Sequence, residues 1–233
     1  MPQPNVILEA LETILKSQPG CPICHYGRQT GRKFMDGILY ESVNDYGLRQ
    51  QLAQSLGFCT FHSQEMLTFP GAKLGAAIIE QAMLKAALRQ IDGMTRARRP
   101  RFGIGKKNVA SVAPPDEQSC MVCQFEQNHE RMAITDLVKH WDAAWAEHLQ
   151  NAGGMCLQHL AQTLLLAPKP MQQTLKQMHN TLWQTHIAHL DEFIRKQDYR
   201  FQDEMISQEE GLASRRTIAI LTGEPRSNGA PDF

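Results

Sequence analysis

The chain has 233 residues, of which 42% are hydrophobic and 21% are charged, a balance typical of globular proteins that excludes a fibrous or fully disordered chain. Its 24 basic residues are matched by 24 acidic residues, which excludes a chain-wide attraction to nucleic acid or acidic membranes and leaves only a local patch open. Aromatic residues make up 7%, while Leu, Ala, Gln, Met and Glu are plentiful, so we predict an all-α protein.

The N-terminal segment does not have the pattern of a secretory signal, because Glu9 and Glu12 interrupt its first apolar run. The most apolar helix candidate, residues 72–88, carries charged side chains and is not expected to span a membrane. We therefore expect a cytoplasmic protein with no membrane partner, in a compartment where thiols stay reduced.

The first half of the chain predicts a series of helices separated by clear breaks. Asn5 has the side chain of an N-cap for the first helix, and Pro19-Gly20 ends that helix. The later helices are expected around Met35 to Leu39 with a break at Asn44-Asp45, from Leu48 to Leu56 with a stop at Gly57, from Cys59 to about Leu67, and from about Ala72 to Asp92.

The second half predicts the same order of elements. One long helix is expected after Cys123, with a single apolar stripe that runs through Leu149 to a stop at Gly153-Gly154. The remaining predictions are a helix that opens at Cys156, a very long helix from about Met171 to Glu204, and a short final helix from about Glu209 to Leu221.

One pattern of cysteines and histidine occurs twice, in the same order. The first set is C-x2-C-x34-C-x2-H and the second is C-x2-C-x32-C-x2-H, and together they use every cysteine of the chain. Three Cys and one His form a complete tetrahedral shell for zinc. The predicted ligands are Cys21, Cys24, Cys59 and His62 in the first site and Cys120, Cys123, Cys156 and His159 in the second.

The spacing within each set suggests how an ion would be held. The third Cys and the His lie three residues apart, so on the first turn of a helix both side chains share one face. Each set would then clamp its ion between a C-x2-C turn and the helix start that follows it in the same half of the chain.

The two sets also indicate a tandem duplication. Cys24 lies 99 residues before Cys123, and Cys59 lies 97 residues before Cys156, so the shift changes by only two residues. We predict two related helical lobes, each organised around a Cys3His metal site. The expected divisions are a first lobe at 1–92, a basic flexible linker at 93–119, a second lobe at 120–223 and a disordered tail at 224–233.

Zinc suits this ligand set, and four protein ligands leave no open position for hydrolytic catalysis. We therefore expect two structural zinc ions per chain and no catalytic residues, and a protein that is not an enzyme is favoured over an enzyme. An iron–sulfur cluster on the same cysteines is the alternative cofactor, although the cysteine spacing does not match the common ferredoxin runs.

Three further features have ordinary structural interpretations. Glu126 and His129 have the spacing of a di-iron motif, but no second motif exists, so we interpret them as a solvated helix face. The group of His179, His186 and His189 is interpreted as the polar edge of a packing helix. The segment from Arg96 to Lys107 has six basic residues and no acidic one, which favours a solvated connector and leaves nucleic-acid binding as an alternative.

At the paired C-P-x-C and G-x-C-x-x-H motifs, the chain resembles an uncharacterised family of bacterial helical proteins. The resemblance covers most of Asn5 to Gly223 and implies no activity. Pro22 is replaced by Met121 in the second set, and His25 by Gln124, so the two sites need not be equivalent.

From the residues we predict a zinc-stabilised helical scaffold or adaptor that binds a protein partner. The alternatives are an iron–sulfur or thiol-based redox protein that uses the same cysteines, and a nucleic-acid-binding protein that uses the basic linker.

Overall fold

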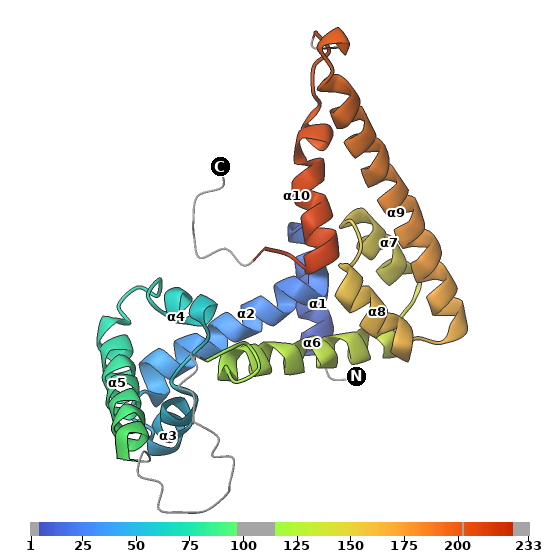
Figure 1. Cartoon of the computed structure of the whole chain (residues 1–233). Coiled ribbons are helices and arrows are strands. Elements are labelled where there is room, and N and C mark those ends of the chain that lie inside the picture. Colours follow the sequence, from blue (N-terminus) through green and yellow to red (C-terminus); the bar gives the residue numbers. More distant parts are fainter. Residues whose placement is uncertain (1–4, 97–114, 202, 226–233) are drawn as a thin grey trace, which may run out of the picture. The chain divides into compact units, whose positions relative to one another are not determined.

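The computed structural model describes residues 5–96, 115–201 and 203–225 (Figure 1). Within these residues every regular element is a helix and no strand occurs, which confirms the predicted all-α class. Contacts divide the described chain into two compact units. Unit 1 comprises residues 5–29 and 128–225, and unit 2 comprises the described residues of 30–127.

This division differs from the predicted lobes at 1–92 and 120–223. The boundary between the units falls inside two helices, α2 (Pro22–Gly37) and α6 (Met121–Lys139). Each of these helices begins at a C-x2-C pair in one unit and ends in the other unit. A sequence repeat shows that two segments are alike, but it does not say which copy packs with which, so the repeat alone did not predict this exchange.

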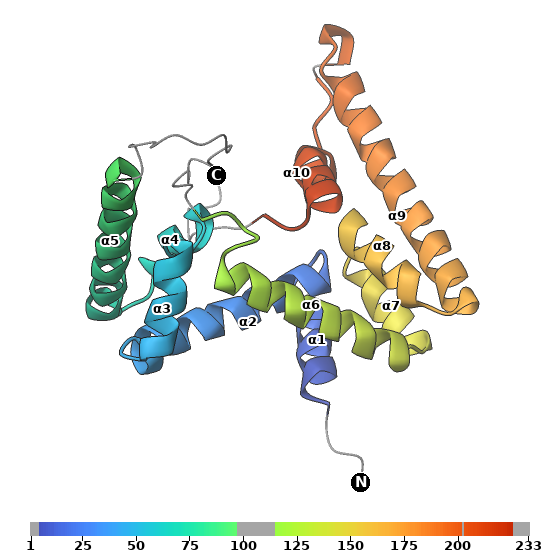
Figure 2. The same ribbon diagram turned by 60° about the horizontal axis from the view of Figure 1, so that its bottom comes forward.

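Besides the first part of α2 and the second part of α6, the described residues of unit 1 contain six further helices. They are α1 (Val6–Ser17), α7 (Ala143–Asn151), α8 (Leu157–Leu166), α9 (Lys169–Lys196), a short 3-10 helix (Tyr199–Phe201) and α10 (Gln208–Thr222). Helix α9 packs against α7, α8 and α10, while α1 packs against α7. Figure 2 shows α7 and α8 beside the first turns of α9. Their apolar faces, together with that of the second part of α6, enclose a core that includes Leu11, Ile14, Ile134, Leu149 and Leu175.

The helix ends of unit 1 follow local capping chemistry. The Asn5 side chain accepts hydrogen bonds from the backbone N–H groups of Ile7 and Leu8, at 3.1 and 3.3 Å, which confirms the predicted N-cap. Helix α10 begins with a capping box formed by Ser207 and Glu210.

Two helix predictions in unit 1 were wrong. The stripe that ends at Leu149 belongs to two helices, because α6 ends at Lys139 and α7 begins after Asp142, whose side chain accepts from Trp145 N at 3.0 Å. The backbone of Asp142 is extended, so a helix cannot continue through it, and its side chain caps the next helix. The apolar positions are spaced as in a single helix on both sides of this break. Helix α9 ends at Lys196 and not near residue 204.

Unit 2 contains the second half of α2, a short π-helical turn (Ile38–Ser42), α3 (Tyr46–Ser55), α4 (Thr60–Met66), α5 (Lys73–Arg96) and the first half of α6. The predicted break is confirmed, since Asp45 caps α3 by accepting from Leu48 N at 2.7 Å. Helix α5 packs against α3 and the π-helical turn, around a core that includes Met35, Leu52, Phe58, Met66 and Ile79.

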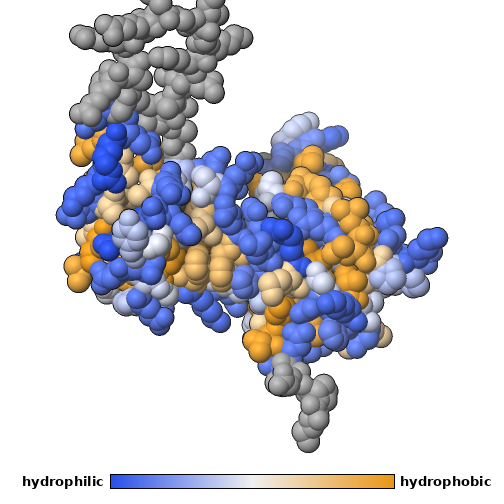
Figure 3. Space-filling model, turned by 90° about the horizontal axis from the view of Figure 1, so that it is seen from below, coloured by the Kyte–Doolittle hydropathy of each residue, from blue (hydrophilic) through white to orange (hydrophobic). Residues whose placement is uncertain are grey.

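The remaining parts of the chain add two observations. In the part of the chain that the structure describes, no helix is both long enough and apolar enough to cross a membrane. Most of the predicted basic linker, residues 97–114, lies outside the described residues. Figure 3 shows apolar residues at several places on an otherwise hydrophilic surface, and the large exposed ones include residues of α5, α8, α9 and α10.

Candidate metal centres

The eight predicted ligands come together in two buried groups of four, within which all ligand atoms lie within 4.8 Å of one another. Site 1, in unit 1, consists of Cys21, Cys24, Cys156 and His159. Site 2, in unit 2, consists of Cys59, His62, Cys120 and Cys123. Each group therefore combines the C-x2-C pair of one half of the chain with the C-x2-H pair of the other half.

The predicted pairing within each half was therefore wrong, although each group still holds three Cys and one His. Both pairings give the same ligand set, so the residue types could not distinguish them. The deciding factor is tertiary: α2 brings Cys21 and Cys24 into the unit that holds α8, and α6 brings Cys120 and Cys123 into the unit that holds α4.

The C-x2-H pairs open helices in the same way in both sites, as predicted. Cys59 is the N-cap of α4 with φ −61° and ψ 166°, and Cys156 is the N-cap of α8 with φ −67° and ψ 160°. Two residues earlier, Gly57 and Gly154 have φ of +106° and +87°, which a residue with a Cβ adopts only at a cost. His62 and His159 then fall on the first turn of their helices, beside their cysteines.

The C-x2-C pairs lie at helix starts and not in separate turns. Cys21 and Cys120 immediately precede α2 and α6, and Cys24 and Cys123 lie in their first turns. A helix N-terminus carries partial positive charge, so this placement favours the thiolate form that a metal ion needs.

The distances between ligand atoms match the edges of a single tetrahedron. Bonds of about 2.3 Å from zinc to sulfur and about 2.0–2.1 Å to nitrogen imply edges of about 3.8 Å between sulfurs and about 3.5 Å between sulfur and nitrogen. In site 1, Cys24 Sγ lies 3.8 Å from Cys156 Sγ, and the three sulfurs lie 3.3–3.4 Å from His159 Nδ1. In site 2 the Cys59–Cys123 distance is 3.6 Å, and the sulfurs lie 3.3–3.5 Å from His62 Nδ1.

Both histidines turn their second ring nitrogen toward a carboxylate of α6. His62 Nε2 lies 3.3 Å from Glu126 Oε1, and His159 Nε2 lies 3.4 Å from Glu130 Oε2. With Nδ1 directed at the sulfurs, the neutral imidazole carries its proton on Nε2, so the N–H of His62 donates a hydrogen bond to Glu126, and that of His159 faces Glu130 at ion-pair distance. This is the arrangement by which metal-binding proteins orient a histidine and raise its basicity.

Two glycines of α2 make room for these carboxylates. A Cβ added to Gly27 would lie 2.5 Å from Glu130 Oε1, and a Cβ added to Gly31 would lie 2.4 Å from Glu126 Oε1. The glycines and the glutamates are each four residues apart, so each pair lies on one face of its helix. Both carboxylates therefore depend on the absence of a side chain on α2.

The groups around each histidine raise its pKa, so the histidine holds a proton that a metal ion would displace. Burial alone would lower the pKa of His62, but its hydrogen bonds with Cys120, Cys59 and Glu126 raise it to about 11. Burial acts likewise on His159, whose bonds with Cys156, Cys24 and Glu130 raise its pKa to about 12.

Within each site the thiols differ in acidity. Hydrogen bonds from Cys123 and Cys59 hold the pKa of Cys120 far below its usual range, while those with Cys120 and Cys59 raise the pKa of Cys123. In site 1, bonds from Cys21 and Cys24 lower the pKa of Cys156, and burial raises that of Cys21. A bound ion requires three thiolates and a neutral imidazole, so binding at either site must release protons.

Two positioning residues were given a different interpretation from the sequence. Glu126 was interpreted as part of a solvated face, but it is 4% exposed and bonded to His62. His179 was interpreted as part of a polar edge, but it is 1% exposed, accepts from Met155 N at 2.8 Å and donates to Leu175 O at 2.8 Å. His179 thereby fixes the loop that leads into Cys156. In the sequence, the one indication of their burial is that Glu126 and His179 each occupy a helix position that the apolar pattern assigns to the core.

Glu224, a residue of the predicted tail, lies next to site 1. Glu224 Oε1 accepts a hydrogen bond from Cys21 N at 3.0 Å, and Arg28 donates to the backbone oxygen of Glu224. A Cβ on Gly223 would lie 3.4 Å from Cys24 Sγ, so the end of α10 covers this site. Residues 224 and 225 are thus placed, in contrast to the expected disordered tail, and residues 226–233 lie outside the described residues.

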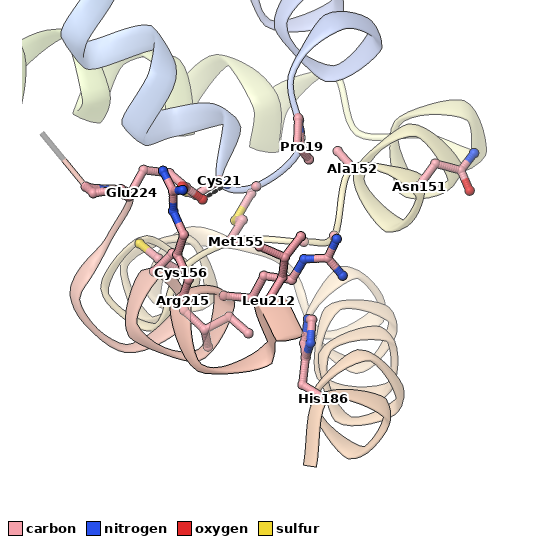
Figure 4. Close-up of a pocket in the computed structure, with 17 residues that line it drawn as sticks. Pro19, Cys21, Asn151, Ala152, Met155, Cys156, His186, Leu212, Arg215 and Glu224 are labelled. Atoms are coloured by element: carbon pink, nitrogen blue, oxygen red, sulfur yellow. Dashed lines mark hydrogen bonds between the residues drawn. The ribbon is translucent and has the colours of Figure 1, made fainter. Parts of the chain in front are cut away.

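A pocket of about 470 Å³ opens beside site 1. Figure 4 shows Cys21 and Cys156 at this pocket, together with Leu212 and Arg215 of α10 and His186 of α9. No ligand of site 2 lines it. Cys21 and Cys156 of site 1 therefore border a space that a small reagent can enter.

The fold and the two sites define the class of the protein: a helical protein with two buried Cys3His clusters, each able to hold a metal ion. The chain belongs to DUF6062, a family of unknown function, whose profile matches residues 7–228. This match confirms the resemblance to an uncharacterised helical family. No solved structure matches the chain.

One curated relative is an "uncharacterized 23.9 kDa protein in xynA 3'region" from Caldicellulosiruptor sp. (strain Rt8B.4). It is 28% identical over 189 residues, which cover 77% of this chain and 83% of the relative.

Proposed function

We propose that each cluster holds one structural zinc ion and that the protein is a helical adaptor that binds a protein partner. The observation that carries this proposal is the closed shell, in which four buried protein atoms at tetrahedral spacing leave no position for a substrate. An ion held in this way stabilises the fold and does not activate water.

The contribution of each ion to folding follows from the segments that it would join. In site 1 it would tie the start of α2 to the start of α8, and in site 2 the start of α6 to the start of α4. These segments are far apart in the sequence, so closing such loops costs considerable chain entropy. The binding free energy of the ion would offset that cost, which couples folding to metal binding.

The spacing of the ligands supports a single ion over an iron–sulfur cluster. In a cluster the four protein ligands are shared between two or more iron atoms, so as a set they are spread more widely than the corners of one tetrahedron. The separations of 3.6 and 3.8 Å between sulfurs support one ion per site. Between single ions, a thiolate-rich Cys3His set supports zinc.

The adaptor role is supported by the surface of unit 1. Leu165 of α8 is 85% exposed, Ile194 of α9 is 65% exposed and Ile218 of α10 is 60% exposed. A contiguous apolar patch is typical of a surface that another protein covers, and these side chains are the positions of unit 1 around which we expect it.

The proposed metal role is tested by elemental analysis and spectroscopy of protein purified without added metal. We expect about two zinc ions per chain, no visible absorption, and a loss of helicity when a chelator removes them. Iron with visible absorption, or full helicity and unchanged thermal stability after both ions are removed, would contradict the proposal.

The adaptor role needs a separate experiment in cells. A photo-crosslinking amino acid at Leu165 is expected to give a discrete crosslinked product, whereas the same amino acid at Lys139, a polar exposed position of unit 1, is not. Identical products from both positions, or none from either, would argue against a partner surface on α8.

A further inference from the structure

Helix α5 has a second apolar face that its own unit does not cover. Leu74, Leu84, Leu88 and Ile91 are 74, 67, 62 and 51% exposed. Ala77 and Gln81 are exposed as well and complete a series at positions 74, 77, 81, 84, 88 and 91. Its steps alternate between three and four residues, which is the spacing of the a and d positions in a coiled coil. We refer to these six residues as the α5 seam.

The opposite face of α5 is already occupied by the core of unit 2. Ala72, Ala76, Ile79 and Ala86 are buried, and α5 packs against α3 and the π-helical turn. Gly75 comes so close to that turn that an added Cβ would lie 2.4 Å from the backbone oxygen of Leu39. The helix cannot rotate to bury the seam without leaving this core.

The charges beside the seam identify a matching partner. With Leu74 at an a position, Glu80 takes a g position and Lys85 the following e position. In a parallel coiled coil a g residue faces the e residue five positions later on the other helix. Two copies of α5 would therefore form two Glu80–Lys85 pairs, whereas an antiparallel pair places g residues beside g residues and e residues beside e residues, so it would form neither.

Gln81 supports the same orientation. It occupies an a position, and in a parallel pair it faces Gln81 of the second copy, so that the two amides can both donate and accept. A polar residue at a single a position is a known device for fixing register and the number of strands. In an antiparallel pair Gln81 would face Leu84, which offers no hydrogen bond. In the single chain Gln81 Oε1 accepts from Lys85 Nζ at 2.9 Å.

We propose that the α5 seam is a self-association surface, through which two copies of this chain pair in a parallel coiled coil. This inference goes beyond the adaptor role and does not depend on the metal sites.

The first test is the oligomeric state of the full chain. Sedimentation equilibrium with the zinc-loaded wild type is expected to show a dimer that dissociates on dilution. The double substitution Leu84→Glu with Leu88→Glu places like charges in the seam and is expected to give a monomer with unchanged helicity. The matched control, Leu165→Glu with Leu166→Glu, changes two exposed leucines of α8 and should remain dimeric.

The second test uses the charge pairs and separates the parallel coiled coil from other contacts. Glu80→Lys alone and Lys85→Glu alone should each weaken dimerisation by at least about fivefold, because each turns two attractive pairs into repulsive ones. An equimolar mixture of the two variants restores both attractive pairs and should form a heterodimer. A wild type that stays monomeric at about 100 μM, a dimer that persists in Leu84→Glu with Leu88→Glu, or no recovery in the mixture would overturn the proposal.

Discussion

The substitution Gly31→Ala tests the link between α2 and the histidine of site 2. The new Cβ would lie 2.4 Å from Glu126 Oε1 and 2.5 Å from its Cγ, so the carboxylate has to leave its position. His62 Nε2, 3.3 Å from Glu126 Oε1, then loses that hydrogen bond. The imidazole becomes less basic and less well oriented toward the ion.

Two opposing effects set the magnitude. Alanine in a helix interior is about 0.8–1.0 kcal/mol more favourable than glycine. The lost hydrogen bond to a charged group costs about 1.5–3 kcal/mol. We therefore expect a net destabilisation of about 0.5–2 kcal/mol. The zinc affinity of site 2 should fall by about 10–100-fold, the usual effect of removing a residue that supports a metal ligand.

Gly37→Ala on the same helix is the matched control. Gly37 has helical φ and ψ of −58° and −37°, and an added Cβ meets nothing within 4 Å. It should be neutral or stabilising by up to about 1 kcal/mol. Chelator competition gives the zinc affinity, and thermal unfolding gives the stability. Equal behaviour of Gly31→Ala and Gly37→Ala in both assays would refute the role assigned to Gly31 and Glu126.

Three further predictions concern the caps and the sites. Asp142→Ala should lower the free energy of unfolding by about 1 kcal/mol in chemical denaturation, since it removes the N-cap of α7; no change would mean that the cap is dispensable. Zinc binding to site 2 at pH 7 should release at least about two protons, from His62 and Cys123, whose raised pKa values keep both protonated until the ion binds; calorimetry in buffers of different ionisation enthalpy counts them, and zero release would contradict this. In metal-depleted protein a small alkylating reagent should modify Cys156 before any cysteine of site 2, because Cys156 borders the pocket and its lowered pKa keeps it as the reactive thiolate; earlier modification of a site 2 cysteine, detected by mass spectrometry of the digested protein, would contradict this.

The sequence predicted the local features of the fold well. Asn5 and Asp45 begin helices where their side chains accept backbone hydrogen bonds, and the helices that open at Cys59 and Cys156 follow glycines with positive φ. These features depend on a few neighbouring residues, so a single sequence contains them. The break at Asp142 was missed because the apolar stripe continues across it in the same phase.

The eight candidate ligands could be selected from the sequence, but their grouping could not. The choice between pairing within a half and pairing across halves depends on which helix reaches which unit, and the two alternatives bury the same residue types. The same limit applies to Glu126, because its burial depends on Gly31 of another helix. The tandem duplication itself stays a prediction.

The most direct test of the crossed sites is zinc retention in two double variants against a fixed competing chelator. Cys24→Ser with Cys156→Ser alters site 1 alone, so it should retain about one zinc ion at wild-type affinity. Cys24→Ser with Cys59→Ser removes one ligand from each site and should retain none at that affinity. The opposite result, with one tightly bound ion in the second variant and none in the first, would show that each half of the chain holds its own ion and would contradict the account.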